Sequence, residues 1–194
     1  MTPWDQVQTV AIPDGQPLVT VNVYSLSPHG GPTPSGLSYI QWVRCPSILR
    51  SISESQERDV EAEYFNDLPG YVWAFSELLP QHLSPEAITV APSRRLLAAP
   101  YMEVAAQRFP GARDLSIYVH KIGETSAAES QSFDEVLESI RYTGPRQDGL
   151  QSLLIVDDML ASGRTAAAMV SRLRALGMPS GAAIAVAVAL RVIR

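Results

Sequence analysis

From residue 85 onward, short runs of apolar residues alternate with helical stretches, and this alternation constrains the fold most strongly. The apolar runs are residues 87–91, 115–119, 152–156 and 182–190. The stretches with helical spacing are residues 97–109, 132–141 and 165–176. Because continuously apolar strands separated by helices are typical of a parallel sheet covered on both faces, the sequence predicts an α/β fold. In such sheets ligands bind beyond the carboxyl ends of the strands.

The first 84 residues have a different pattern, and we interpret them as an N-terminal α+β extension. Residues 18–26 and 38–44 have the partly alternating polarity of strands, and the glycines and prolines between them favour a long hairpin. Residues 85–194 then form the core. The sequence therefore predicts two units, 1–84 and 85–194.

Two helices are expected within this extension. Ser53 followed by Gln56 is a capping-box pattern, which predicts a helix over residues 54–65. A second helix is predicted over residues 71–79, ending before Pro80.

Composition excludes several classes of function. The 194 residues are 46% hydrophobic and carry a formal net charge of -5, so the chain has the apolar content for a core but lacks the basic balance of a nucleic-acid binder. Cys45 is the only cysteine, which suits a reducing compartment. The longest apolar run, 182–190, is shorter than the about 20 residues of a membrane span, and no signal peptide is apparent. We expect a cytoplasmic protein that binds neither nucleic acid nor membrane.

Residues 153–165 carry the clearest chemical pattern. An apolar strand ends in two adjacent carboxylates, Asp157 and Asp158, and a short turn then leads into an alanine-rich helix. Free N–H groups at a helix start form an anion site, Gly163 permits close approach or a positive φ, and the hydroxyls of Ser162 and Thr165 add donors. Carboxylates suit paired hydroxyls or a hydrated cation. The segment therefore favours a site for a sugar phosphate.

The same segment resembles the phosphoribosyl-diphosphate signature of the type I phosphoribosyltransferases, and each defining position is matched. The resemblance covers residues 85–190 and implies that family's parallel-sheet core. It implies that Asp157 and Asp158 hold the ribose 2- and 3-hydroxyls and stabilise a ribosyl cation. It also implies that the 5-phosphate is bound by Ala161, Ser162, Gly163, Arg164 and Thr165. Mg²⁺ would bridge the diphosphate and the ribose hydroxyls, without a ligand set of protein side chains.

Two further loops are similar to elements of this family. The loop after the first core strand contains Ser93, Arg94 and Arg95, and arginines there suit a leaving diphosphate. The family often has glycine in this loop, whereas this sequence has none there. Residues 121–130 are small and polar, as in the family's mobile loop, and Lys121 would contact diphosphate during catalysis.

The acceptor is less well defined by the sequence. The 6-oxopurine enzymes of the family carry an aspartate where this chain has Ala161, so activity through that aspartate is not expected. A base-binding hood would come from the N-terminal region, where Trp42, Tyr71 or Trp73 could stack on a base, or could instead form the core of that region.

The resemblance implies a phosphoribosyltransferase that transfers ribose 5-phosphate to a nucleobase or another nitrogen acceptor and releases diphosphate. Its expected partners are phosphoribosyl diphosphate and an acceptor base, and a homodimer is compatible with the sequence. The alternative is a non-catalytic regulator or ligand sensor, because the signature indicates binding of the ligand and not its turnover.

Overall fold

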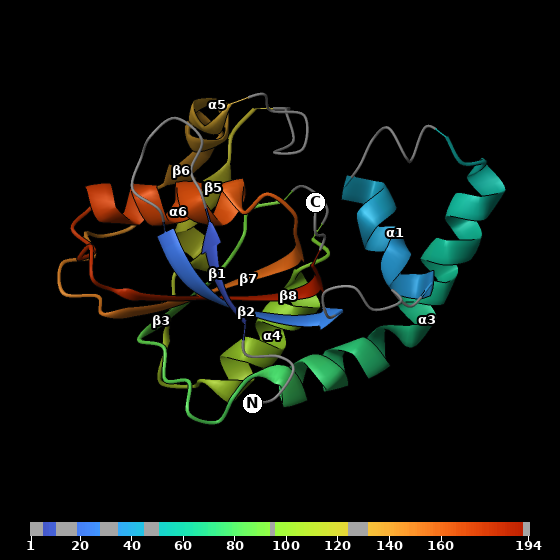
Figure 1. The fold of residues 1–194 in the computed structure, drawn as a ribbon, viewed down its shortest axis with the longest axis horizontal. Coiled ribbons are helices and arrows are strands. Elements are labelled where there is room, and N and C mark those ends of the chain that lie inside the picture. Colours follow the sequence, from blue (N-terminus) through green and yellow to red (C-terminus); the bar gives the residue numbers. More distant parts are fainter. Residues whose placement is uncertain are drawn as a thin grey trace.

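A six-stranded sheet forms the centre of the molecule (Figure 1). The computed structural model describes residues 6–10, 19–27, 35–44, 51–93, 96–123 and 132–191. The strand order is β1-β2-β8-β7-β3-β4, and all neighbours are parallel except β1 and β2. The predicted α/β class with a parallel sheet is therefore confirmed. The strands are β1 (Gln6–Val10), β2 (Val19–Ser27), β3 (Ala87–Val90), β4 (Arg113–Asp114), β7 (Ser152–Leu160) and β8 (Ala183–Arg191).

Helices cover both faces of this sheet. One face packs against α4 (Ala99–Arg108) and the C-terminal part of α3 (Glu54–Leu78), and α1 (Ser35–Arg44) packs against α3. The other face packs against α6 (Arg164–Ala175). Outside α6 lie α5 (Phe133–Glu138) and a separate antiparallel pair, β5 (Val119–Lys121) and β6 (Ile140–Tyr142).

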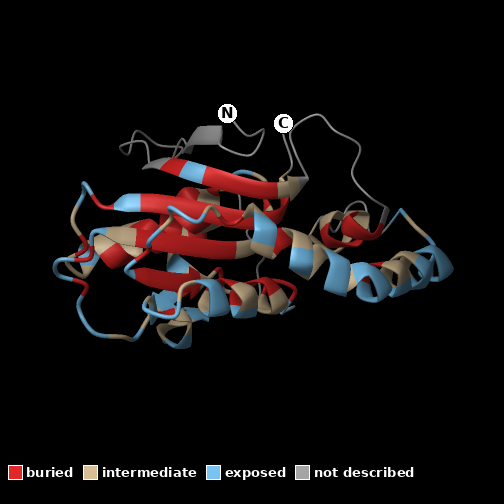
Figure 2. Ribbon diagram, turned by 90° about the horizontal axis from the view of Figure 1, so that it is seen from below, coloured by how far each residue is buried: buried red, intermediate tan, exposed pale blue. Residues whose placement is uncertain are grey.

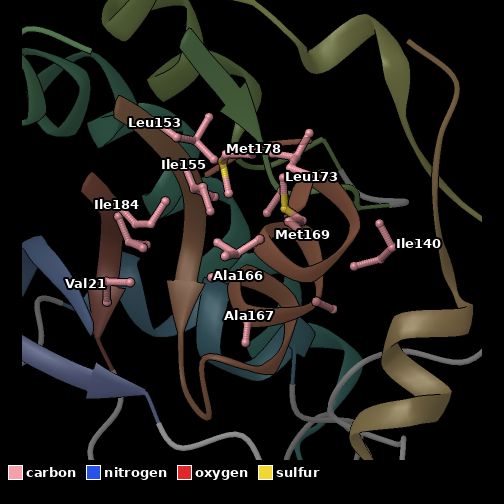
Figure 3. Packing of buried hydrophobic residues seen from close by; sticks show 14 of the residues in the cluster. Val21, Ile140, Leu153, Ile155, Ala166, Ala167, Met169, Leu173, Met178 and Ile184 are labelled. Carbon is pink, nitrogen blue, oxygen red and sulfur yellow. The ribbon is translucent and has the colours of Figure 1, made fainter. Parts of the chain in front are cut away.

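Alternating side chains of the strands divide the core into two layers. On β7, Leu153 and Ile155 pack toward α6, whereas Leu154 and Val156 pack toward the opposite helices. Figure 3 shows the α6 layer, in which Met169 and other apolar side chains of the helix face the strands. Figure 2 shows the central strands buried along most of their length, while α3 presents many exposed residues. Burial of each large apolar side chain stabilises the fold by roughly 1.5–3 kcal/mol.

The N-terminal strand prediction is half correct. Residues 18–26 were expected as a strand, and β2 confirms this, but residues 38–44 lie in α1 and the predicted hairpin is wrong. The aromatic and β-branched residues of this segment favour a strand locally. Tertiary packing instead uses the three-residue spacing of Leu37 and Ile40, which are both buried in the core layer that also contains residues of α3 and of the sheet.

The predicted capping box is present, but the two predicted helices are one. The Ser53 hydroxyl accepts from the backbone of Gln56, whose side chain accepts from the backbone of Ser53, and α3 then continues for 25 residues through Pro69. Tyr64 and Phe75 lie on either side of that proline and are both fully buried. We infer that their packing offsets the hydrogen bond lost at Pro69.

Residues 115–119 do not form the predicted core strand. The edge position is taken by the two residues of β4, and the chain then turns into a 3₁₀ helix over Ser116–Tyr118. Leu115 is buried and its N–H donates to the Ile88 carbonyl, whereas Ile117 is 66% exposed. The apolar residues of this run therefore do not share one buried face.

β2 joins the N-terminal region to the rest of the sheet. It pairs in parallel with β8 over Asn22–Ala185 to Ser27–Leu190, so both parts of the chain contribute to one sheet. The division into functional units at residues 84 and 85 stays a prediction. Within the described residues, no helix combines the length and the apolar character needed to cross a membrane.

Candidate functional site

The acidic pair lies within β7, which continues beyond it to Leu160. The strand was expected over residues 152–156, but it continues through Asp157 and Asp158 to Leu160. Asp157 pairs with Val188 and Met159 with Leu190, so β8 supports this extension. The carboxylates are thereby fixed on a buried strand near its carboxyl end.

Arg44, the last residue of α1, contacts both carboxylates. Its Nε donates to Asp158 Oδ2 over 2.8 Å, and its Nη2 donates to Asp158 Oδ1. Nη2 also lies 4.0 Å from Asp157 Oδ1. The Asp158 side chain is only 1% exposed and that of Arg44 is 24% exposed, so this is a largely desolvated, two-point ion pair.

Close packing of α1 against α3 holds Arg44 in this position. Gly36 is buried at the start of α1, and an added Cβ there would lie 2.7 Å from the Tyr71 hydroxyl and 3.3 Å from the Tyr64 Cα. Figure 1 shows α1 and the start of α3 beyond the end of the sheet toward which β2 and β8 point. Helix α1 therefore places Arg44, its last residue, at the carboxyl ends of the strands.

Burial and mutual repulsion set the electrostatics of the pair. Loss of solvent raises the pKa of Asp157 well above its usual range, and the charge of Asp158 raises it further, while Arg44 opposes both effects. Burial alone would lower the pKa of Arg44, but the two carboxylates outweigh this and raise it. The guanidinium thus stays charged, and Asp157 retains its proton to a higher pH than an ordinary aspartate.

Two buried tyrosines lie close enough to Asp158 to sense its charge. The hydroxyls of Tyr64 on α3 and Tyr101 on α4 are 3.2 Å apart, and both side chains are essentially inaccessible. Burial is the main cause that raises the pKa of each phenol, and the negative charge of Asp158 adds to it. The sequence reasoning did not identify Arg44, Tyr64 or Tyr101, because each comes from an element remote in sequence from β7.

The turn after β7 has the backbone that the sequence led us to expect. Gly163 has φ 71° and ψ 1°, a left-handed conformation, and directly precedes α6. The Arg164 N–H lies 3.5 Å from the Ser162 hydroxyl oxygen, and Ser162 is exposed. The first turn of α6 contains no acidic residue, so no carboxylate of the helix competes for its N–H groups. Ala161 and Thr165 are partly buried beside them.

The loop after β3 begins next to the acidic pair. Ala91 N donates to the Val156 carbonyl over 2.8 Å, immediately before Asp157. Ser93 follows two residues later and is partly buried. Arg94 and Arg95, the predicted diphosphate ligands, lie outside the described residues.

Lys121 lies on the small sheet formed by β5 and β6, and not on a core strand. Its Nζ donates to the Ser139 hydroxyl over 3.3 Å, and neighbouring His120 Nε2 is 3.0 Å from Thr143 Oγ1. The predicted lid, 121–130, falls mostly outside the described residues, which end at Gly123 and resume at Ser132. The catalytic role of Lys121 stays a prediction.

The aromatic residues predicted to form a hood occupy different environments. Tyr71 stacks on Tyr64 with ring centroids 5.9 Å apart, so it belongs to the packed α1–α3 layer. Trp73 is 68% exposed on α3, and Trp42 is half-buried on α1. Stacking on a base by Trp42 or Trp73 stays a prediction.

The donor set at the pair does not fit a resident Mg²⁺ ion. Both oxygens of Asp158 accept from Arg44, and Asp157 Oδ1 accepts from the backbone N–H of Asp158 over 2.8 Å. Among the described residues, no group of three or more His, Cys, Asp or Glu side chains is placed to hold a metal ion. A cation at this position would have to displace the arginine.

No family model matches the chain, and no curated protein matches it in sequence. One similar solved structure is a purine phosphoribosyltransferase from Pyrococcus horikoshii Ot3, with a TM-score of 0.42 and 13% identity. The match covers 66% of this chain and 84% of that chain.

Proposed function

We propose that this protein binds phosphoribosyl diphosphate at the carboxyl end of β7 and transfers its ribose 5-phosphate to a nitrogen acceptor. One observation carries the proposal: a desolvated carboxylate pair is followed within a few residues by a left-handed glycine at the start of a helix. One strand–turn–helix unit thereby combines carboxylates that accept hydrogen bonds from sugar hydroxyls with backbone N–H groups that donate to a phosphate.

In the proposed reaction the acceptor nitrogen forms a bond to the anomeric carbon of the ribose. The bond from that carbon to diphosphate breaks, and its electron pair leaves with diphosphate, while the nitrogen releases its proton to solvent water. Asp157 orients the ribose hydroxyls, and the Asp157–Asp158 pair stabilises positive charge on the ribosyl group. The N–H groups of 161–165 bind the 5-phosphate, Arg94 and Arg95 neutralise the leaving diphosphate, and Ser93 donates a hydrogen bond to it.

Calorimetry with phosphoribosyl diphosphate tests the binding step. We expect saturable binding to the wild type, with loss of binding in Gly163→Val, where a β-branched side chain would obstruct the turn. Ligand at 100 times its dissociation constant adds about 2.7 kcal/mol to the free energy of unfolding. Gly181→Val is the matched control, because a Cβ at Gly181 meets no atom within 4 Å. No binding by a folded wild type would contradict the proposal.

A second candidate is a non-catalytic regulator that binds the ligand without turnover. The contact of Arg44 with Asp158 favours it, because the arginine occupies both oxygens of a carboxylate that would otherwise face the sugar. Release of diphosphate in the presence of a panel of nucleobases separates the two. A transferase releases diphosphate only when the acceptor is present, whereas a regulator binds the ligand and releases none.

A further inference from the structure

Arg44 neutralises a carboxylate that has little access to water. Arg44 Nε and Nη2 donate to the two Asp158 carboxylate oxygens, and the Asp158 side chain is 1% exposed. Because an isolated charge at such a position is costly, a fixed counter-charge is needed. Here that counter-charge comes from α1, an element outside the β7–α6 unit.

The arginine also changes what the pair offers to a ligand. Asp158 and, once it has lost its proton, Asp157 carry negative charge, and the guanidinium cancels one of these charges. A divalent cation needs several oxygen ligands and is repelled by a guanidinium within a few ångströms. Asp158 presents no oxygen that is not already shared with Arg44, and Asp157 Oδ1 lies 4.0 Å from the same Nη2.

We propose that Arg44 is the resident cation of the acidic pair and a specificity-determining residue, which excludes a free divalent cation from the pair and makes the binding of a sugar phosphate without diphosphate independent of divalent metal. The guanidinium supplies the positive charge that a metal would otherwise bring to the carboxylates. Asp157 is left as the carboxylate that approaches a sugar hydroxyl. The part of the proposal that concerns a sugar ligand rests on the proposed function, whereas the exclusion of free metal does not.

Mn²⁺ alone is the direct probe, read by its effect on water-proton relaxation. We expect the wild-type protein to enhance relaxation no more than the double variant Asp157→Asn/Asp158→Asn does, because the acidic pair of the wild type does not bind Mn²⁺. Arg44→Gln should bind Mn²⁺ about tenfold more tightly or better, since a repelling charge is removed and both carboxylates become free. Arg146→Gln is the matched control, because it removes an arginine from an exposed two-point pair with Asp148 and should leave Mn²⁺ binding unchanged.

Two results would overturn the proposal. One is Mn²⁺ binding by the wild type that the double Asp→Asn variant abolishes. The other is a folded Arg44→Gln that binds no more Mn²⁺ than the wild type. If Arg44→Gln does not fold, the comparison of Mn²⁺ binding by the wild type and by the double Asp→Asn variant still tests the proposal. Arg44→Lys provides a second comparison, because it retains the positive charge and should exclude Mn²⁺ as the wild type does.

Ribose 5-phosphate tests the sugar part of the proposal, because it lacks the diphosphate that itself chelates metal. Its affinity for the wild type should be the same in chelator and in millimolar Mg²⁺, whereas its affinity for Arg44→Gln should rise when Mg²⁺ is added. A strict Mg²⁺ requirement in the wild type would overturn the inference. Absence of ribose 5-phosphate binding under all conditions would contradict the proposed function instead. The conclusion from the Mn²⁺ measurements would not depend on that result.

Discussion

Arg44 Nε donates to Asp158 Oδ2 over 2.8 Å, although 114 positions separate the two residues in the sequence. This contact links the C-terminus of α1 to the carboxyl end of β7. It joins the N-terminal region to the strand that carries the acidic pair.

Arg44→Ala should destabilise the protein strongly, because it leaves the buried Asp158 carboxylate without its counter-charge. The expected loss is about 3–5 kcal/mol in the free energy of unfolding, measured by urea denaturation. Arg146→Ala removes the exposed pair with Asp148 and should cause no measurable loss. Equal losses in the two variants would show that burial of the Arg44 pair has no energetic consequence.

Asp157→Asn should change how stability depends on pH. The pKa of Asp157 is raised in the folded state above the about 3.9 of an unfolded aspartate, so folding favours the protonated form. The stability that this group contributes is present below the unfolded pKa and is lost as pH rises through the folded pKa. The variant should therefore lack this loss and be more stable than the wild type near neutral pH.

Urea denaturation at a series of pH values measures this effect, with Asp59→Asn on the exposed surface of α3 as control. The control should follow the wild-type profile. If the Asp157→Asn profile also follows it, burial does not raise the pKa of Asp157 as described.

Gly163→Ala should destabilise the fold by about 1–2 kcal/mol, because an L side chain is strained at φ 71°. Gly111→Ala places its methyl where no atom lies within 4 Å and should be nearly neutral. Thermal denaturation of both variants provides the comparison. A neutral Gly163→Ala would mean that the turn adopts another backbone in solution, and the proposed phosphate cradle would need revision.

Arg94→Ala and Arg95→Ala should weaken binding of phosphoribosyl diphosphate while leaving ribose 5-phosphate binding nearly intact. The 5-phosphate is expected at 161–165, whereas the diphosphate extends toward the loop after β3. Loss of a charge-assisted contact of ~1.5–3 kcal/mol should reduce affinity roughly tenfold or more. Titration of both ligands against each variant measures the difference. Equal weakening of both ligands would indicate a general effect of positive charge, and no weakening would assign these arginines to the solvated surface.

Local patterns in the sequence were sufficient to predict those features that depend only on neighbouring residues. The apolar runs at 152–156 and 182–190 identified the two central strands, because a strand buried on both faces needs apolar residues at every position. The capping box at Ser53 and the glycine at 163 were also identified, since each acts within a few residues of chain. The position of the acidic pair at the carboxyl edge followed from the same periodicity.

Packing between remote segments decided the rest. Residues 38–44 have strand-like composition, yet burial of Leu37 and Ile40 in the core makes the segment helical, and in this conformation Arg44 reaches Asp158. Pro69 similarly failed to end α3, because Tyr64 and Phe75 pack on both sides of it. The sequence by itself determined the α/β sheet and the two carboxylates on β7. The tertiary structure decided which cation neutralises them, because an ion pair depends on distances in space that local patterns of sequence do not encode.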